Sequence, residues 1–215
     1  MTKIKICCIQ NRREVDLAVE AGVDAIGLVS VMPSGPGVID EDSIRELLDY
    51  ARGRIERFLL TSSVSAVDIT DQYHRFEPDT LQLVDSVSED EYREIRKQIS
   101  GVRLVQVIHV RGESAIEEAR LYAGLADALL LDSGNPGLSV KSLGGTGKVH
   151  DWHISRKIVE LVNVPVYLAG GLNPANIAEA VHTVKPHGVD VCSGIRRAGL
   201  LEEDMLKRFV DEVRR

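Results

Sequence analysis

Two side chains capable of acid–base chemistry stand at the ends of apolar runs in this sequence. Asp132 follows three leucines in LLLDS, where loss of water raises the pKa of a carboxyl group and lets it donate a proton near neutral pH. Cys7 stands near the end of IKICCI, and a thiol whose pKa falls can act as a base. Residue type alone nevertheless favours a different role for Cys7, that of a small buried hydrophobic residue.

Two glycine-containing turns late in the chain have the composition of an anion site. Gly170 and Gly171 end the run VYLAGG, and Ser193 and Gly194 end the run GVDVCSG. Glycine lets a backbone approach an anion closely, and free amides at a helix N-terminus carry partial positive charge. Either turn alone could be an ordinary connection. On neighbouring strands, the two turns together predict a phosphate cradle.

A third glycine-rich segment lies between Asp132 and these turns. It contains Gly144, Gly145, Thr146 and Gly147. Its length favours a loop that closes over a ligand, rather than a passive connection. Lys148 follows, but the G-x-x-x-x-G-K-[ST] spacing of a nucleotide-binding loop is absent, so the sequence argues against nucleotide hydrolysis.

Other ionisable residues are candidates for weaker roles. His109 and Arg111 stand at the end of the fifth apolar run, where they could contact a ligand or form a surface pair. The segment HDWH begins at His150, and we expect Asp151 within it to cap a helix. Capping is favoured over metal binding because the sequence places no further ligand group beside this cluster. We therefore predict no metal site.

These residues are positioned by a repeating pattern of strand and helix. Eight apolar, β-branched runs are each followed by a stretch with helical periodicity. The apolar runs are 4–9, 25–30, 57–62, 80–84, 103–110, 128–133, 164–170 and 188–194. The helical stretches are 11–22, 40–52, 66–76, 88–99, 113–124, 153–162, 174–184 and 202–214. Nearly continuous apolar strands are typical of a parallel sheet that is covered on both faces.

Eight such units predict an α/β fold, a (β/α)8 TIM barrel of eight parallel strands, with residues 1–215 as a single domain. An open dinucleotide-binding sheet would need G-x-G-x-x-G after the first strand, where this chain has QNRREVD. Phosphate sites of barrels usually follow strands seven and eight, where the two glycine turns fall. Cys7 and Cys8 should alternate along their strand, so that only one of them faces the barrel interior.

Composition narrows the class of protein further. The chain of 215 residues has a formal net charge of −7, which disfavours non-specific nucleic-acid binding but permits an anion site built from amides. The cysteines Cys7, Cys8 and Cys192 form neither a disulfide framework nor a zinc spacing, which suits a reducing cytosol. No apolar run is long enough for a membrane span. We expect a cytoplasmic protein that binds a phosphorylated small molecule, with homodimer formation left open.

Six segments together resemble the phosphoribosylanthranilate isomerase family of tryptophan biosynthesis. They are KIC at 5–7, AGVDAIGLV at 21–29, LLLDS at 129–133, GGTGKVHDW at 144–152, LAGGLNPANI at 168–177 and GVDVCSGI at 188–195. They follow one another in the family's order along essentially the whole chain.

This resemblance implies an Amadori rearrangement, which converts an N-phosphoribosyl aminoaldose into an aminoketose without a cofactor. The family's general acid, here Asp132, helps to open the furanose ring to a Schiff base. Its general base, here Cys7, then removes the C2 proton to give an enolamine. The resemblance therefore reverses the interpretation of Cys7 as a packing residue. The family's phosphate site falls on Gly170, Gly171, Ser193 and Gly194.

The chain departs from the family pattern at the other end of the expected site. Pro36 takes the place of an arginine that meets the anthranilate carboxylate, and Val84-Asp85 replace the last two residues of a QLHG motif. Losing a charge-assisted hydrogen bond would weaken binding by about 1.5–3 kcal/mol. Cys8 replaces the glycine of KICGI, and Cys192 replaces a serine.

Three hypotheses about function follow from these observations. The first is phosphoribosylanthranilate isomerase activity, which the acid–base pair and the order of motifs favour. The second is a paralogous barrel enzyme for another phosphorylated sugar or aminosugar, which Pro36 favours. The third is a non-catalytic sugar-phosphate binder, in which Cys7 and Asp132 would be dispensable. Arg111 is a candidate replacement for the missing arginine.

Overall fold

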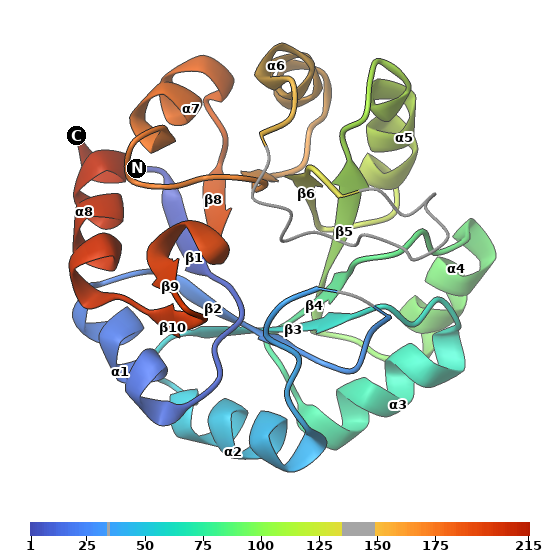
Figure 1. Cartoon of the computed structure of the whole chain (residues 1–215). Helices are drawn as coiled ribbons and strands as arrows, with labels where there is room; N and C mark the ends of the chain where they lie inside the picture. The colour runs from blue at the N-terminus through green and yellow to red at the C-terminus, as the bar shows by residue number, and fades with distance from the viewer. Residues whose placement is uncertain (34, 135–148) are drawn as a thin grey trace.

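Eight parallel strands close into a barrel in the computed structural model of the chain (Figure 1). The structure describes residues 1–33, 35–134 and 149–215. The strands are β1 (Lys3–Ile6), β2 (Ala25–Val29), β3 (Glu56–Thr61), β4 (Thr80–Leu83), β5 (Arg103–His109), β6 (Ala128–Asp132), β7 (Val166–Leu168) and β8 (Gly188–Val191). Each strand pairs with the next in chain order, and β1 pairs with β8 to close the ring. The predicted fold class is confirmed.

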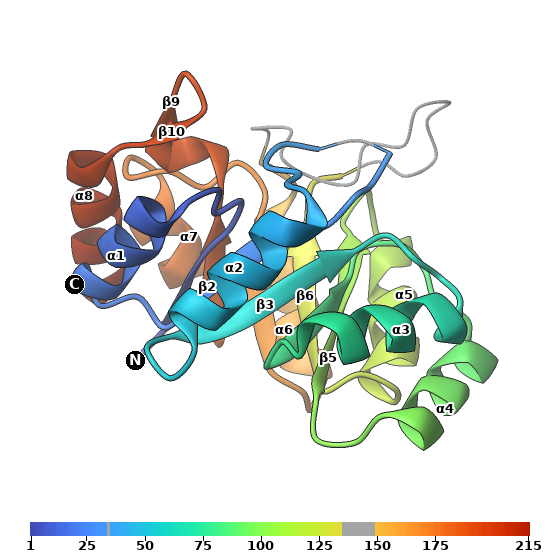
Figure 2. The same cartoon turned by 90° about the horizontal axis from the view of Figure 1, so that it is seen from below.

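The helices form an outer ring around this barrel (Figures 1 and 2). They are α1 (Arg12–Glu20), α2 (Glu41–Ala51), α3 (Ala66–Phe76), α4 (Glu89–Gln98), α5 (Ser114–Ala123), α6 (Trp152–Leu161), α7 (Ile177–Val184) and α8 (Glu203–Arg214). The expected cap is confirmed, since Oδ1 of Asp151 accepts a hydrogen bond from the His153 amide at 2.8 Å. Within the described ranges, no helix is long and apolar enough to cross a membrane.

Three short elements between β8 and α8 are not part of the eight-unit pattern. A 3₁₀ turn, η1 (Ser193–Ile195), is followed by an antiparallel hairpin of β9 (Arg196–Arg197) and β10 (Leu200–Leu201). The hairpin projects beyond the barrel at the end opposite the N-terminus (Figure 2). This segment brings Arg196 to the end of the barrel where the candidate site lies.

Side chains alternate between two separate cores, which explains the continuous apolar character of the strands. Ile4 and Ile6 of β1 belong to the larger core between barrel and helices. Phe58 and Tyr167 belong to the smaller core inside the barrel. A strand in this position must be buried on both faces. The described side chains therefore fill the barrel interior as a second core.

Glycines inside the barrel make room for larger neighbours. At Gly188, an added Cβ would lie 2.5 Å from Cε1 of Tyr167, so the tyrosine ring occupies the space beside the glycine backbone. The Tyr167 ring also contacts the edge of Phe58, with ring centroids 6.2 Å apart. Gly188 on β8 therefore leaves the space that the Tyr167 side chain of β7 fills.

We expect Gly188→Ala to destabilise the barrel, because its methyl group would overlap the Tyr167 ring. Overpacking of this kind costs about 1–3 kcal/mol of unfolding free energy, measurable by urea denaturation. Gly112→Ala is the matched control, since an added Cβ there meets nothing within 4 Å. Equal stability of the two variants would show that the Tyr167 ring can move aside without cost.

Candidate active site

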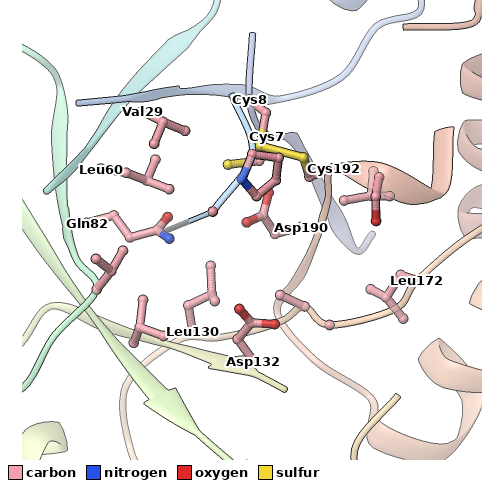
Figure 3. Close-up of a pocket in the computed structure, with 18 of the residues that line it drawn as sticks. Cys7, Cys8, Val29, Leu60, Gln82, Leu130, Asp132, Leu172, Asp190 and Cys192 are labelled. Atoms are coloured by element: carbon pink, nitrogen blue, oxygen red, sulfur yellow. A yellow bond between two sulfur atoms is a disulfide. The ribbon is translucent and has the colours of Figure 1, made fainter. Parts of the chain in front are cut away.

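A cavity opens at the carboxyl ends of the strands, where barrel enzymes carry their active sites (Figure 3). It encloses about 680 Å³, part of which is open to solvent. Five of the predicted catalytic and phosphate-binding residues line it: Cys7, Asp132, Gly170, Gly171 and Ser193. Figure 3 shows the carboxyl group of Asp132 pointing into the same space as Cys7. The fold thus brings together residues that are far apart in the sequence.

Asp132 is the last residue of β6 and is buried. Its Oδ1 accepts a hydrogen bond of 2.7 Å from the Ser133 amide. Burial raises the pKa of Asp132 to about 6, although the Ser133 amide opposes that shift. A carboxyl group with this pKa exists in both protonation states near neutral pH, as a general acid requires.

Gly170 is required beside this carboxyl group. Its backbone has φ +81°, a conformation that favours glycine. An added Cβ would also lie 2.9 Å from the Ser133 amide nitrogen and 3.0 Å from Oδ1 of Asp132. The turn after β7 therefore packs directly against the acid, and a side chain there would displace it.

Cys7 is a free, buried thiol just beyond the end of β1. Burial raises its pKa to about 11, while the nearby Lys5 ammonium acts in the opposite direction. The backbone at Cys7 is held by Arg196, whose guanidinium donates to the carbonyl oxygens of Cys7 and Cys8 at 3.3 and 2.7 Å. Arg196 is itself paired with buried Glu14 at 2.7 Å. This network fixes the position of the thiol.

Cys8 also lines the cavity, so the expectation that only one of the two cysteines faces the interior was wrong. Strand β1 ends at Ile6, and Cys8 has φ 64°, in the left-handed region. Side-chain alternation stops where the extended strand stops. This conformation also explains why a glycine suits the position of Cys8 in the family pattern.

A disulfide bond joins Cys8 to Cys192, which corrects the expectation that the cysteines form no disulfide (Figure 3). The two residues are 184 positions apart in the sequence, but their Cα atoms are 5.9 Å apart. They become neighbours because β1 pairs with β8 when the barrel closes. Cysteine count and spacing carry no information about that closure.

The turns after β7 and β8 form the predicted phosphate side of the cavity. Gly171 has φ +68°, and Ser193 begins the short turn η1. Gly194 does not line the cavity; it packs against the Leu172 carbonyl, so closely that an added Cβ would overlap it. Gly194 thus lets the two turns touch, while Gly171 and Ser193 face the open space.

The remaining residues singled out from the sequence lie elsewhere. His109 is buried outside the cavity lining, with Nε2 3.1 Å from the Val84 carbonyl oxygen, and burial lowers its pKa. Arg111 is exposed and likewise does not line the cavity. Gly144, Gly145, Thr146 and Gly147 lie outside the described residues. In the part of the chain that is described, no group of three or more His, Cys, Asp or Glu residues is placed to hold a metal ion.

Three polar residues at the site were not singled out from the sequence. Lys5 is buried inside the barrel, and Asp190 and Gln82 line the cavity. Oδ1 of Asp190 and Oε1 of Gln82 are buried and accept no hydrogen bond from the described residues. Each of the three is a polar residue inside an apolar strand, and the same pattern that identified Asp132 could have identified them in the sequence. These free acceptors can bind hydroxyl or amine groups of a ligand.

Comparisons with known proteins agree with this arrangement. A sequence model of the family described as N-(5'phosphoribosyl)anthranilate (PRA) isomerase matches residues 4–212. The chain belongs to this family. The N-(5'-phosphoribosyl)anthranilate isomerase of Methanocella arvoryzae is 35% identical over 216 residues, covering 100% of this chain and 99% of its own. That of Haloarcula marismortui is 36% identical over 212 residues, covering 98% and 95%.

Solved structures of the family share the fold. The crystal structure of phosphoribosyl anthranilate isomerase from Thermotoga maritima superimposes with a TM-score of 0.85 at 26% identity, covering 100% of this chain and 99% of its own. A structure of the same enzyme type in complex with reduced 1-(o-carboxyphenylamino)-1-deoxyribulose 5-phosphate gives a TM-score of 0.82 at 24% identity, with the same coverage. The second likeness establishes the barrel only.

We expect the disulfide to stabilise the barrel by restricting the unfolded chain. Cys192→Ser should lower the unfolding free energy by about 2–5 kcal/mol in chemical denaturation without reductant. With tris(2-carboxyethyl)phosphine present, the variant and the original protein should agree within about 0.5 kcal/mol. A difference that persists under reduction would mean that Cys192 stabilises by packing alone.

Proposed function

We propose that this chain catalyses the Amadori rearrangement of N-(5'-phosphoribosyl)anthranilate, with Asp132 as general acid and Cys7 as general base. The supporting observation is the shared cavity, in which both groups face the glycine turns after β7 and β8. The relatives are named N-(5'-phosphoribosyl)anthranilate isomerase, an activity that is this rearrangement. No cofactor is needed, because the reaction only moves protons and electrons within one molecule.

Ring opening is the first step that the site would assist. Protonated Asp132 donates to the furanose ring oxygen as the C1–O bond breaks, and the amine nitrogen forms a Schiff base with C1. Burial keeps enough of Asp132 protonated near neutral pH for this role. The Ser133 amide stabilises the carboxylate that remains.

Proton removal from C2 is the second step. The Cys7 thiolate takes the C2 proton, and the electron pair flows toward the iminium nitrogen, which gives an enolamine. Tautomerisation of the enolamine completes the aminoketose. Because burial raises the pKa of Cys7 to about 11, the thiolate is a minor but strongly basic form.

The phosphate group is proposed to bind between Gly170, Gly171 and Ser193, with Gly194 holding the two turns together. Glycine turns let amides approach the anion, and the Ser193 hydroxyl adds a donor. This binding would place the sugar across the barrel, with its reacting carbons between β1 and β6. Binding energy at the phosphate can thereby position the C2 proton beside Cys7.

The opposite wall favours a second candidate, an enzyme for another phosphorylated aminosugar. This wall contains Pro36, Met32 and Val84, and no lysine or arginine lines the cavity among the described residues. An aromatic ring suits such an apolar wall, but a carboxylate there needs a donor. Assay of purified protein with N-(5'-phosphoribosyl)anthranilate separates the two, since only the first candidate predicts turnover.

The proposal also covers where and in what form the protein acts. A biosynthetic isomerase of this family is proposed to work in the cytoplasm on a free phosphorylated substrate, without nucleic acid or membrane. A homodimer is proposed because the related Thermotoga maritima enzyme is described as dimeric. Size-exclusion chromatography with light scattering tests the homodimer.

Cys7→Ser and Asp132→Asn should each lower kcat by about 10²–10⁴-fold, because each removes one proton-transfer group. The assay follows the loss of anthranilate-substrate fluorescence. Asp42→Asn, a change of the same type at an exposed position on α2, should leave turnover unchanged. Unimpaired turnover by Cys7→Ser would refute the base assignment, and no turnover by the unmutated protein would refute the isomerase proposal.

The pH dependence follows from the two raised pKa values. The productive form has a protonated Asp132 and a thiolate at Cys7. Below about pH 6 the dominant form has both groups protonated, and therefore carries one proton more. We therefore expect kcat/KM to fall about tenfold per pH unit below pH 6. From about pH 6 to about 11 the two groups share one proton, so kcat/KM should stay level. A decline beginning just above pH 6 would contradict this assignment.

A further inference from the structure

A buried ion pair lies directly below the proposed base. Lys5 is 0% exposed and its Nζ is 2.9 Å from Oδ2 of Asp190, which is 7% exposed. Lys5 on β1 and Asp190 on β8 are register partners where the barrel closes. Removing two charges from water is costly even when they pair, so this ion pair in the barrel interior calls for a function.

Lys5 lies on β1 and Cys7 follows directly after the strand's end, and both side chains lie inside the barrel. Gly27 on the adjacent strand β2 makes room for both. An added Cβ at Gly27 would lie 3.0 Å from Sγ of Cys7 and 3.0 Å from Nζ of Lys5. The ammonium and the thiol therefore occupy one small space beside a glycine backbone.

The ammonium group of Lys5 has N–H donors available for a further partner. Asp190 is near enough for an ion pair, but Nζ of Lys5 makes no hydrogen bond of good geometry to any described residue. The ring of Phe58 lies on its other side, with the centroid 5.1 Å away. A thiolate at Cys7 would supply the ammonium with a second anionic partner.

We propose that Lys5 is a positioning residue whose positive charge stabilises the thiolate form of Cys7, and that Asp190 limits this effect by competing for the same charge. This inference deepens the proposed function, on whose assignment of Cys7 as base it rests. The titratable groups that face Cys7 from the described parts of the barrel are Lys5, Asp190 and Asp132. Lys5 is the only cation among them, since the guanidinium of Arg196 contacts the carbonyl oxygen of Cys7 and is paired with Glu14.

Lys5 and Asp190 should shift the pKa of Cys7 in opposite directions, which provides the sharpest test of the inference. An opposite charge at this range shifts a pKa by about 1–3 units, and nucleophilicity offsets about half of the resulting change in rate. Lys5→Met should therefore slow iodoacetamide modification of Cys7 at pH 9 by about 3- to 30-fold. Asp190→Asn should accelerate it by about 3-fold or more.

The rate is measured by mass spectrometry of the peptide that contains Cys7, so that modification at Cys8 or Cys192 does not interfere. Lys3→Met is the matched control: it removes the same charge from the same strand, but from a half-exposed side chain that pairs with Asp24. Its Cys7 should react at the rate of the unmutated protein. Equal rates in Lys5→Met and Lys3→Met would overturn the inference.

Lys5→Met leaves Asp190 buried without a partner and could impair folding. The double variant Lys5→Met/Asp190→Leu removes both charges and fills the space with apolar atoms, which is often tolerated in a protein interior. Slow modification of Cys7 in this variant, with a cooperative unfolding transition, supports the inference. Modification at or above the unmutated rate overturns it.

Turnover provides a separate readout. Lys5→Met should lower kcat with little change in KM, because the phosphate turns are untouched. Since the modification experiment uses no substrate, its outcome does not depend on which sugar the enzyme accepts. Absence of turnover in the unmutated protein would refute the proposed function, whereas unchanged modification rates would refute only the role of Lys5.

Discussion

The candidate site depends on one constraint, the pairing of the first strand with the last. The register of β1 against β8 places Lys5 beside Asp190 and brings Cys8 within disulfide distance of Cys192. The residues that follow β8 also contact the end of β1, since Arg196 donates hydrogen bonds to the carbonyl oxygens of Cys7 and Cys8. Without closure, the proposed base would have neither the Lys5–Asp190 ion pair nor the turn after β8 beside it.

Burial has opposite consequences for the two proposed catalytic groups. It raises the pKa of Asp132 to about 6, which keeps an acid available near neutral pH. It raises the pKa of Cys7 to about 11, which disfavours the thiolate that a base requires. The same loss of water also strengthens the attraction between a thiolate and a neighbouring ammonium. The Lys5 ammonium therefore compensates for the burial of the thiol, and Asp190 favours the charged form of that ammonium.

The cavity has two walls of different character. The turns after β7 and β8 offer glycine backbone and the Ser193 hydroxyl, which suit an anion. The wall with Pro36 and Val84 offers apolar surface, which suits a ring but not its carboxylate. Family membership and the acid–base pair favour the anthranilate substrate. The contacts that this wall makes with a ligand will determine how selective the enzyme is.

The sequence by itself determined the order of strands and helices, the barrel, and the placement of Asp132 and the glycine turns, because each follows from local periodicity or from its position at a strand end. It did not reveal the disulfide, the inward position of Cys8 or the ion pair of Lys5 with Asp190. The disulfide and the ion pair join residues more than 180 positions apart and arise only when the ring closes with a particular register, whereas the inward position of Cys8 follows from its left-handed backbone after β1 ends. Tertiary structure decided them because a one-residue shift between β1 and β8 would separate every one of these pairs.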